Sequence, residues 1–399
     1  MNKETVDELL MAMVKGGEGI SDLLFVAGKP PLVEEHGKLK AAAAIAPYTS
    51  ELTGDDIERL AGCLMQGNPR LVDDFANLGS CDCSYSIEKL ARFRVNVFKQ
   101  NGRHAIVMRK LQSVIPTLDK LGLPPIFRQI VKEKTGVVFV TGGTGSGKTT
   151  TLAAMLNELN QTSEIHVVTL EDPIEFLHPH AKAAFSQREL GRDFPDFAHG
   201  LRAALRQAPK VIFVGEIRDR ETMEIALTAS ETGHLVFSTL HTINAGQTVN
   251  RILGMFTNEE EQQVRQRLAD TLRYVVSQRL VSRIDGGRLL VSEIMGNSMR
   301  TREVLLYGED DNRSFQEIIE SGNASGWHSF DQSLVKAFDA NLITEETAML
   351  FCTHKNKMRR DVDVVKKMRC TEPDAPTGFK LQVDPLEAAR AARQAAQHQ

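Results

Sequence analysis

The stretch GVVFVTGGTGSGKT, which spans Gly136–Thr149, decides the fold class of this chain. Its first part, Val137–Val140, is a short β-branched apolar run, as is typical of a buried parallel strand. A glycine-rich loop follows, and after Lys148 and Thr149 a helical pattern continues over residues 150–157. Strand, G-x-x-x-x-G-K-[ST] loop and helix in this order predict a phosphate-binding loop.

This loop predicts a site for a nucleoside triphosphate. Glycines allow backbone N–H groups to turn inward around phosphate oxygens, and the N-terminal end of the following helix adds positive potential. Lys148 can reach the β- and γ-phosphates, and the Thr149 hydroxyl can ligate Mg²⁺. The expected nucleotide-binding residues are those of the loop and the start of the helix: Gly142, Gly143, Thr144, Gly145, Ser146, Gly147, Lys148, Thr149 and Thr150.

From the loop onward, strand and helix patterns alternate, which favours a parallel α/β sheet. The predicted strands cover residues 137–140, 166–170, 211–214, 235–238 and 289–294. The predicted helices cover residues 126–134, 196–208, 220–232 and 245–255. After Gly296 the pattern becomes helical throughout, over residues 300–306, 315–321, 330–338 and 344–352.

Residues 1–112 predict a separate α+β domain. A helix over the first 20 residues, strands over 21–39 and a helix from Thr53 precede alternating segments over 81–109 that fit antiparallel strands. Pro116 and the run Gly122–Pro125 indicate a linker over residues 113–125, which would lead into a second domain over 126–370. Residues 371–399 contain few large apolar side chains and predict a flexible tail.

The composition of the 399 residues is that of an ordinary globular protein, with 42% hydrophobic and 25% charged residues. The net charge of −4 gives no support to a nucleic-acid partner. No apolar run approaches the roughly 20 residues that span a bilayer, so we expect no direct membrane insertion. The five cysteines are few, scattered and odd in number, which favours a reducing compartment and a cytoplasmic location.

Acidic residues follow two of the predicted strands. The segment TLEDPIEF, residues 169–176, ends a strand in three acids, and Glu175 is our candidate for the base that activates the attacking water. Glu171 and Asp172 could act on Mg²⁺ indirectly or hold the loop, and a solvated acidic turn is the alternative interpretation. Glu216 follows the strand 211–214 and is the candidate for holding the metal, directly or through water.

Histidines and arginines complete the candidate site. His234 and His241 flank the strand LVFSTL; each could sense the γ-phosphate, and a purely structural role is the alternative. Hydrolysis also needs a guanidinium at the γ-phosphate, often from a neighbouring subunit. The candidates are Arg92, Arg94 and Arg109 in the first domain and Arg188, Arg202, Arg206 and Arg218 in the second.

These segments together resemble the PilT-type retraction ATPases of type IV pili, which belong to the wider secretion ATPase superfamily. The resemblance is carried by ARFRVN, TGGTGSGKTTTLAAML, TLEDPIEF, SQRE, VGEIRD and TASETGHLVFSTLHT. It implies a PAS-like first domain, a short linker and a RecA-like ATPase domain with a helical C-terminal part. It also implies ATP and Mg²⁺ as ligands, and a homohexameric ring at the inner face of the cytoplasmic membrane that powers pilin removal.

The resemblance also implies roles and partners. Glu175 becomes the catalytic glutamate, Glu216 the glutamate of the second acidic strand, and Lys148 and Thr149 the phosphate and Mg²⁺ ligands. His234 and His241 fall on the two histidine-box positions. Arg92, Arg94 and Arg109 fall where the first domain reaches a neighbour's nucleotide. The implied partners are an inner-membrane platform protein and a second pilus ATPase.

Other functions share part of this pattern. A pilus-extension or secretion motor would use the same phosphate site, but extension ATPases of this superfamily carry a four-cysteine metal site that this chain lacks. The segment Met299–Leu306 also departs from the helix motif tied to retraction, so an accessory retraction-like ATPase remains an alternative. A nucleotide-dependent regulatory module and a nucleic-acid translocase are further alternatives from other classes.

Overall fold

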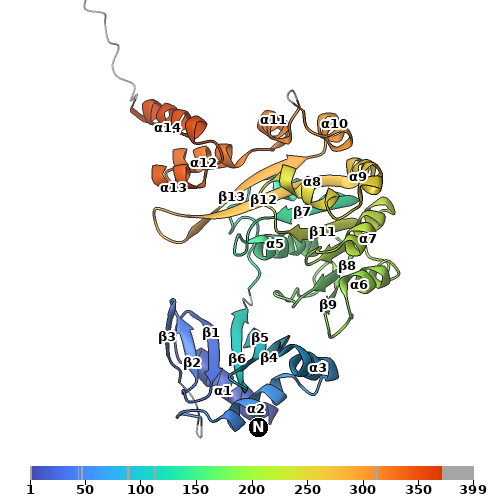
Figure 1. Cartoon of the computed structure of the whole chain (residues 1–399). Coiled ribbons are helices and arrows are strands. Elements are labelled where there is room, and N and C mark those ends of the chain that lie inside the picture. The colour runs from blue at the N-terminus through green and yellow to red at the C-terminus, as the bar shows by residue number, and fades with distance from the viewer. Residues whose placement is uncertain are drawn as a thin grey trace, which may run out of the picture.

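Two β-sheets, each covered by helices, form the two bodies of this computed structural model (Figure 1). The structure describes residues 2–43, 45, 48–87, 90–111, 114–310 and 313–370. The predicted tail over 371–399 therefore lies outside the described residues, as do the two residues at which the first predicted domain meets its linker.

The N-terminal body is a six-stranded sheet in the order β3-β2-β1-β6-β5-β4, and every neighbouring pair in it is antiparallel. The antiparallel strands predicted over 81–109 are confirmed. The helix predicted at the N-terminus buries Val6, Leu9, Leu10, Met13 and Val14, as its apolar spacing indicates. The elements are α1 (Lys3–Lys15), β1 (Ile20–Val26), β2 (Leu32–Glu35), β3 (Lys38–Ala41), α2 (Gly54–Leu64), α3 (Pro69–Leu78), β4 (Ser80–Ile87), β5 (Ala91–Gln100) and β6 (Arg103–Leu111).

The second body is built on a seven-stranded sheet in the order β13-β12-β7-β11-β10-β8-β9. All neighbouring pairs are parallel except the last hairpin, β12 with β13. Its strands are β7 (Gly136–Thr141), β8 (His166–Glu171), β9 (Ala184–Glu189), β10 (Val211–Val214), β11 (Leu235–Leu240), β12 (Leu272–Ser282) and β13 (Arg288–Gly296). Its helices are α4 (Ile126–Ile130), α5 (Lys148–Thr162), α6 (Phe197–Ala204), α7 (Arg220–Glu231), α8 (Ala245–Leu253) and α9 (Asn258–Thr271).

The sheet differs from the prediction in three strands. The segment predicted as a further parallel strand, 289–294, is the antiparallel β13, because only five residues separate it from β12 and a parallel crossover needs a dozen or more. Strands β9 and β12 and helix α9 were absent from the sequence-based prediction. The predicted strands at 137–140, 166–170, 211–214 and 235–238 are confirmed as β7, β8, β10 and β11.

The chain after Gly296 is helical among the described residues, as expected. Its helices are α10 (Met299–Tyr307), α11 (Phe315–Ser321), α12 (Phe330–Asp339), α13 (Glu345–Phe351) and α14 (Lys355–Cys370). The last of these was not predicted, because its apolar residues are few among many charges. The buried carboxylate of Asp331 holds the start of α14 by accepting from the backbone N–H groups of Thr353 (2.6 Å) and His354 (3.0 Å).

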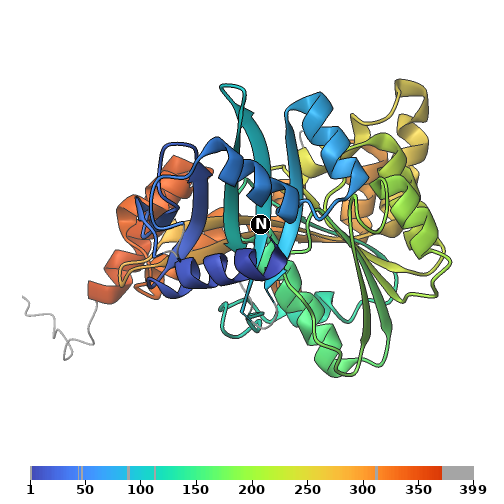
Figure 2. The same ribbon diagram turned by 90° about the horizontal axis from the view of Figure 1, so that it is seen from below.

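The six parallel strands, β12, β7, β11, β10, β8 and β9, bring their carboxyl ends to one edge of the sheet. Every residue of β7, β10 and β11 is buried, so these strands are fixed from both faces and their following loops start from rigid positions. The N-terminal body lies at that edge, because its Arg94 lines one cavity with residues that follow β7, β8, β10 and β11. Figure 2 views the molecule from this side, with the N-terminal body in front. Ligand sites in open α/β sheets lie outside the carboxyl ends of the strands, so a ligand site is expected at this edge.

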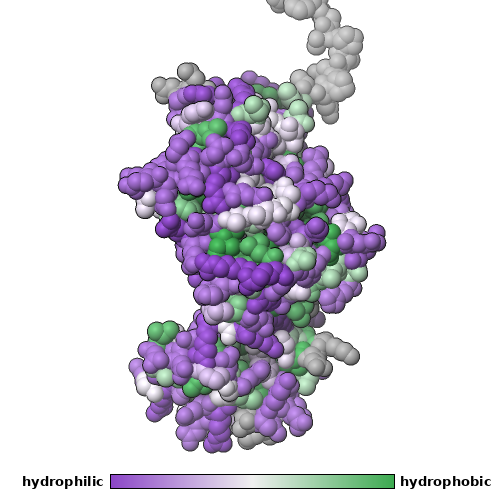
Figure 3. Space-filling model, turned by 90° about the vertical axis from the view of Figure 1, so that its right-hand side faces the viewer, coloured by the Kyte–Doolittle hydropathy of each residue, from purple (hydrophilic) through white to green (hydrophobic). Residues whose placement is uncertain are grey.

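The surface seen in Figure 3 is mainly hydrophilic, with separate apolar patches. Of the helices that the structure describes, none combines the length and the apolar character that crossing a bilayer requires.

Candidate active site

The loop between β7 and α5 has the backbone that a phosphate-binding loop needs. Gly142 has φ +145°, and a Cβ there would lie 2.5 Å from the Ser146 hydroxyl and 2.6 Å from the Gln278 carbonyl oxygen. Gly147 has φ +91°, a left-handed conformation, directly before the first residue of α5. Both positions therefore require glycine. Among the described residues no side chain caps α5, so the N–H groups of its first turn remain available for an anion.

Lys148 lies within the curve of this loop. Its ammonium group donates to the carbonyl oxygens of Gly142 (2.9 Å) and Gly143 (3.0 Å), and its side chain is buried. Burial lowers the pKa of Lys148, and the carboxylates of Glu216 and Glu175 partly offset that effect. An ammonium group held by neutral carbonyls next to two acids is a strong ligand for a phosphate.

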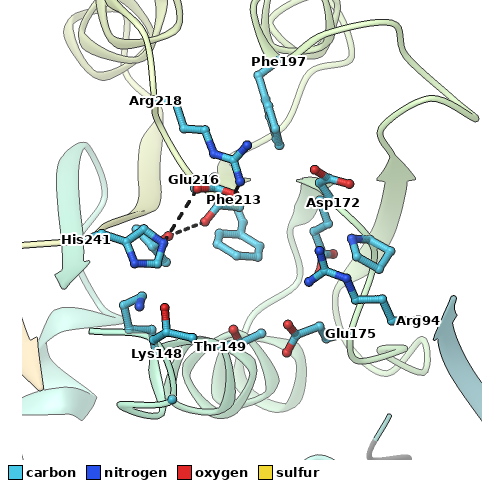
Figure 4. Close-up of a pocket in the computed structure, with 16 residues that line it drawn as sticks. Arg94, Lys148, Thr149, Asp172, Glu175, Phe197, Phe213, Glu216, Arg218 and His241 are labelled. Atoms are coloured by element: carbon cyan, nitrogen blue, oxygen red, sulfur yellow. Dashed lines mark hydrogen bonds and ion pairs between the residues drawn. The ribbon is translucent and has the colours of Figure 1, made fainter. Parts of the chain in front are cut away.

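The acids face the loop across a cavity of about 440 Å³. Figure 4 shows Lys148, Thr149 and Glu175 along one side of it and Glu216 and Asp172 opposite. Glu175 lies beside Thr149; burial raises the pKa of Glu175, while the neighbouring Thr149 hydroxyl and the charges of Arg94 and Lys148 lower it. The predicted base thus lies beside the predicted phosphate ligands.

Glu216 lies between Arg218 and His241. Arg218 donates to one carboxylate oxygen, and Nε2 of His241 is 3.8 Å from the other. Burial is the main reason why the pKa of His241 is lowered, with the charge of Lys148 second. Glu216, Arg218 and His241 all line the cavity (Figure 4), so three of the predicted residues meet there.

His234 does not line the cavity, so the structure does not bring it together with Lys148, Glu175 and His241. The ring Nδ1 of His234 lies 3.0 Å from the Ala229 carbonyl oxygen, just before β11 begins. The six residues of β11 separate it from His241, roughly 20 Å at the rise of a strand. Parallel strands carry their sites at the carboxyl ends, and His234 is at the amino end.

The arginines differ in their surroundings. Arg94 lines the main cavity, and Arg109 and Thr150 line an adjoining one of about 490 Å³ that shares Arg94, Thr144 and Glu175 with it. Arg109 is paired with Asp22 at 2.8 Å. The other candidates have partners elsewhere or lie on the surface: Arg92 pairs with Glu189 of the second body, Arg188 donates to the Asp193 carbonyl, Arg202 pairs with Glu221, and Arg206 is exposed.

The structure adds residues that the sequence analysis did not propose. Phe197, Phe213 and Thr239 line the main cavity. Gln187 and Glu189 on β9 hold the segment that carries Glu175, and β9 itself was not predicted. In the sequence, the segment SQRE contributed to the family resemblance, but no role was assigned to Gln187 or Glu189.

Glu171 is a buried anchor under the acidic segment. It is 6% exposed and accepts from the Thr169 hydroxyl (2.6 Å) and from Gln187 (3.2 Å). Burial raises its pKa from the ordinary 4.5 to about 7 in the folded protein, although both hydrogen bonds lower it. Since the folded state binds the proton more tightly than the unfolded chain, the stability from this group is full below about pH 4.5 and is lost as the pH rises through about 7.

Glu171→Gln should therefore raise the melting temperature at pH 8 and leave it nearly unchanged at pH 4.5. A shift from 4.5 to about 7 corresponds to a stability difference on the order of 3 kcal/mol at high pH. The glutamine oxygen can still accept from Thr169 and Gln187. Thermal unfolding of both proteins across this pH range is the measurement, and an equal difference at both ends would show that folding does not raise the pKa of Glu171.

The residues present fit a nucleotide with Mg²⁺. The Ser146 hydroxyl is buried and has no partner among the described residues, although it belongs to the loop. The open space at Gly143 and Gly145, where a Cβ would meet nothing within 4 Å, leaves room for a ligand against the backbone. Thr149 and Glu216 offer a hydroxyl and a carboxylate, the oxygen ligands that Mg²⁺ prefers.

Known proteins match the chain over most of its length. The sequence model of the family "Type II/IV secretion system protein" matches residues 82–321. The Type IV pilus retractation ATPase PilT of Pseudomonas aeruginosa is 40% identical over 343 residues, 86% of this chain and 96% of that protein. A "Twitching motility protein" of Neisseria gonorrhoeae is 40% identical over 319 residues, 80% of this chain and 83% of that one.

A solved structure matches as well. The crystal structure of the pilus retraction motor PilT with bound ADP has a TM-score of 0.78 and 37% identity, and the match covers 89% of this chain and 99% of that chain. Fold, loop and facing acids thus define the class: the chain belongs to the type II/IV secretion system protein family, whose sequence model matches it. Within that superfamily it belongs to the PilT-type retraction ATPases of type IV pili.

Proposed function

We propose that the chain is a Mg²⁺-dependent ATPase that works as a homohexameric ring and powers the retraction of type IV pili. The observation that carries the proposal is the position of Glu175, which lies beside Thr149 at the start of α5 and across the cavity from Glu216. The names of the relatives, a retraction ATPase and a twitching motility protein, support the choice of pilus retraction.

The chemistry follows from the chain's own groups. Glu175 would accept a proton from a water as that water attacks the γ-phosphorus and the bond to the ADP oxygen breaks. The raised pKa of Glu175 favours taking up that proton. Lys148 would leave the loop carbonyls for the phosphates, and Mg²⁺ held by Thr149 and Glu216 would supply further positive charge there. Arg94 and Arg109 are our candidates for the guanidinium at the γ-phosphate.

Motion would come from the two bodies. We assign the first to the PAS-like and the second to the RecA-like class, with the segment around Pro116 to Pro125 as the hinge between them. Because Arg94 of the first body and Lys148 of the second line one cavity, the bound nucleotide would change how the bodies sit on each other. Around a ring this becomes stepwise rotation, transmitted to a platform protein at the inner face of the cytoplasmic membrane and aided by a second pilus ATPase.

A strain that carries Glu175→Ala tests the proposal. Retraction predicts cells with more surface pili than wild type and with no twitching, because assembly continues while disassembly stops. Pilus number by electron microscopy and spreading on agar are the two measurements. A strain without surface pili would identify an extension motor instead, and normal pili with normal twitching would contradict both.

A further inference from the structure

Arg92 joins the two bodies within one chain. It lies on β5 of the N-terminal sheet, and its Nη2 is 2.6 Å from Oε2 of Glu189, the last residue of β9 in the other sheet. Ser84 on β4 donates to the second oxygen of the same carboxylate at 2.6 Å. The side chains of Arg92 and Glu189 are only 12% and 8% exposed. Salt screens such a pair much less than a surface ion pair.

Glu189 also binds the segment that carries Glu175, the proposed catalytic base. The oxygen that receives Arg92 also accepts from the backbone N–H of Ile174, at 3.2 Å, one residue before Glu175. Gln187, two residues earlier on β9, donates to the Phe176 carbonyl oxygen at 2.8 Å. The segment around Glu175 is thus held from β9, and the N-terminal body holds the end of β9.

The ion pair between Arg92 and Glu189 contributes little net stability. The Nε and Nη1 atoms of Arg92 are buried and have no partner among the described residues. Taking a guanidinium out of water and leaving part of it unpaired offsets much of what the ion pair contributes. A buried arginine with this cost points to a role beyond holding the two bodies together.

We propose that Arg92 and Glu189 form a positioning contact, through which the placement of the N-terminal body sets the position of Glu175 in the same chain. Arg92 is then a positioning residue rather than a ligand of a neighbour's nucleotide. Opening of the two bodies would release Glu189 and with it the N–H of Ile174, which uncouples the base from the phosphate loop. The inference rests on the proposed function for its kinetic part only.

Hydrogen exchange in the nucleotide-free full-length protein tests the contact without any turnover. Arg92→Ala and the gentler Arg92→Gln should speed amide exchange in the peptide that covers residues 172–178, because the acceptor for Ile174 is no longer fixed. Arg59→Ala, an exposed arginine on α2 of the same body, is the matched control and should leave that peptide unchanged. Unchanged exchange in both Arg92 variants, with the fold intact by circular dichroism, would overturn the proposal.

ATP turnover and nucleotide binding separate positioning from ligation. Arg92→Gln and Glu189→Gln should each lower kcat by at least about fivefold, while the Kd for a fluorescent ATP analogue stays within about twofold. The double variant should be no slower than the slower single variant, because both changes break one contact. If the Kd rose in Arg92→Gln alone and the losses in kcat of the two single variants added up in the double variant, Arg92 would instead be a nucleotide ligand. A wild-type protein without turnover would defeat the proposed function and leave the exchange test valid.

Discussion

Glu175→Gln is expected to lower the kcat of ATP hydrolysis by roughly 10²–10⁴-fold, the contribution typical of a positioned general base. Glutamine keeps the shape and can still accept a hydrogen bond, but it cannot take up the proton of the attacking water. The Kd for a fluorescent ATP analogue should change little, since Lys148 and the loop amides remain. Steady-state phosphate release and equilibrium titration measure the two quantities.

Glu164→Gln is the matched control for that experiment. Glu164 is exposed and lies just before β8, at the amino end of the same strand whose carboxyl end leads to Glu175. This variant should turn over ATP at the wild-type rate. If the kcat of Glu175→Gln equalled that of Glu164→Gln, another residue would have to be the general base. Glu175 would then have only a structural role in its loop.

Lys148→Ala should lose both binding and rate. The ammonium group is the cation enclosed by the phosphate loop, where it bonds to the Gly142 and Gly143 carbonyl oxygens. Removing it takes away one preorganised donor at the phosphates, which typically costs about 10²–10³ in kcat, and weakens the binding of the triphosphate as well. Titration with the analogue and single-turnover hydrolysis at saturating ATP separate the two effects.

Lys132→Ala, an exposed lysine before β7, is the control here and should behave as wild type. Because Lys148 also ties two loop carbonyls together, its removal could loosen the protein, so the melting temperature of Lys148→Ala must be compared with that of the control. Near-normal hydrolysis by a well-folded Lys148→Ala protein would contradict the assignment of this loop as the phosphate site.

The phosphate loop was predictable because its requirements are local. The glycines at 142 and 147 are fixed by backbone conformation and close approach, and the strand and helix on either side carry clear patterns. The acids were predictable for a similar reason: the carboxyl ends of parallel strands meet at one edge. Strand patterns alone therefore brought Glu175, Glu216 and His241 to the right place.

The rest of the site depends on contacts between distant segments. His234 lies apart from the cavity because a strand has two ends and only the carboxyl end of β11 faces the site. Arg92 and Arg94 are two residues apart and lie on the same face of β5. Arg92 nevertheless pairs with Glu189, whereas Arg94 lines the cavity. Strand β9 is short and mixed in polarity, so nothing in its sequence indicated that it would support the catalytic segment.

The most direct test of the central claim is a structure of the full chain with Mg²⁺ and a non-hydrolysable ATP analogue. We predict the β- and γ-phosphates within the curve of residues 142–147, Lys148 turned from the loop carbonyls toward them, and Glu175 facing the γ-phosphate. An analogue bound elsewhere, or a γ-phosphate out of reach of both Lys148 and Glu175, would contradict the account.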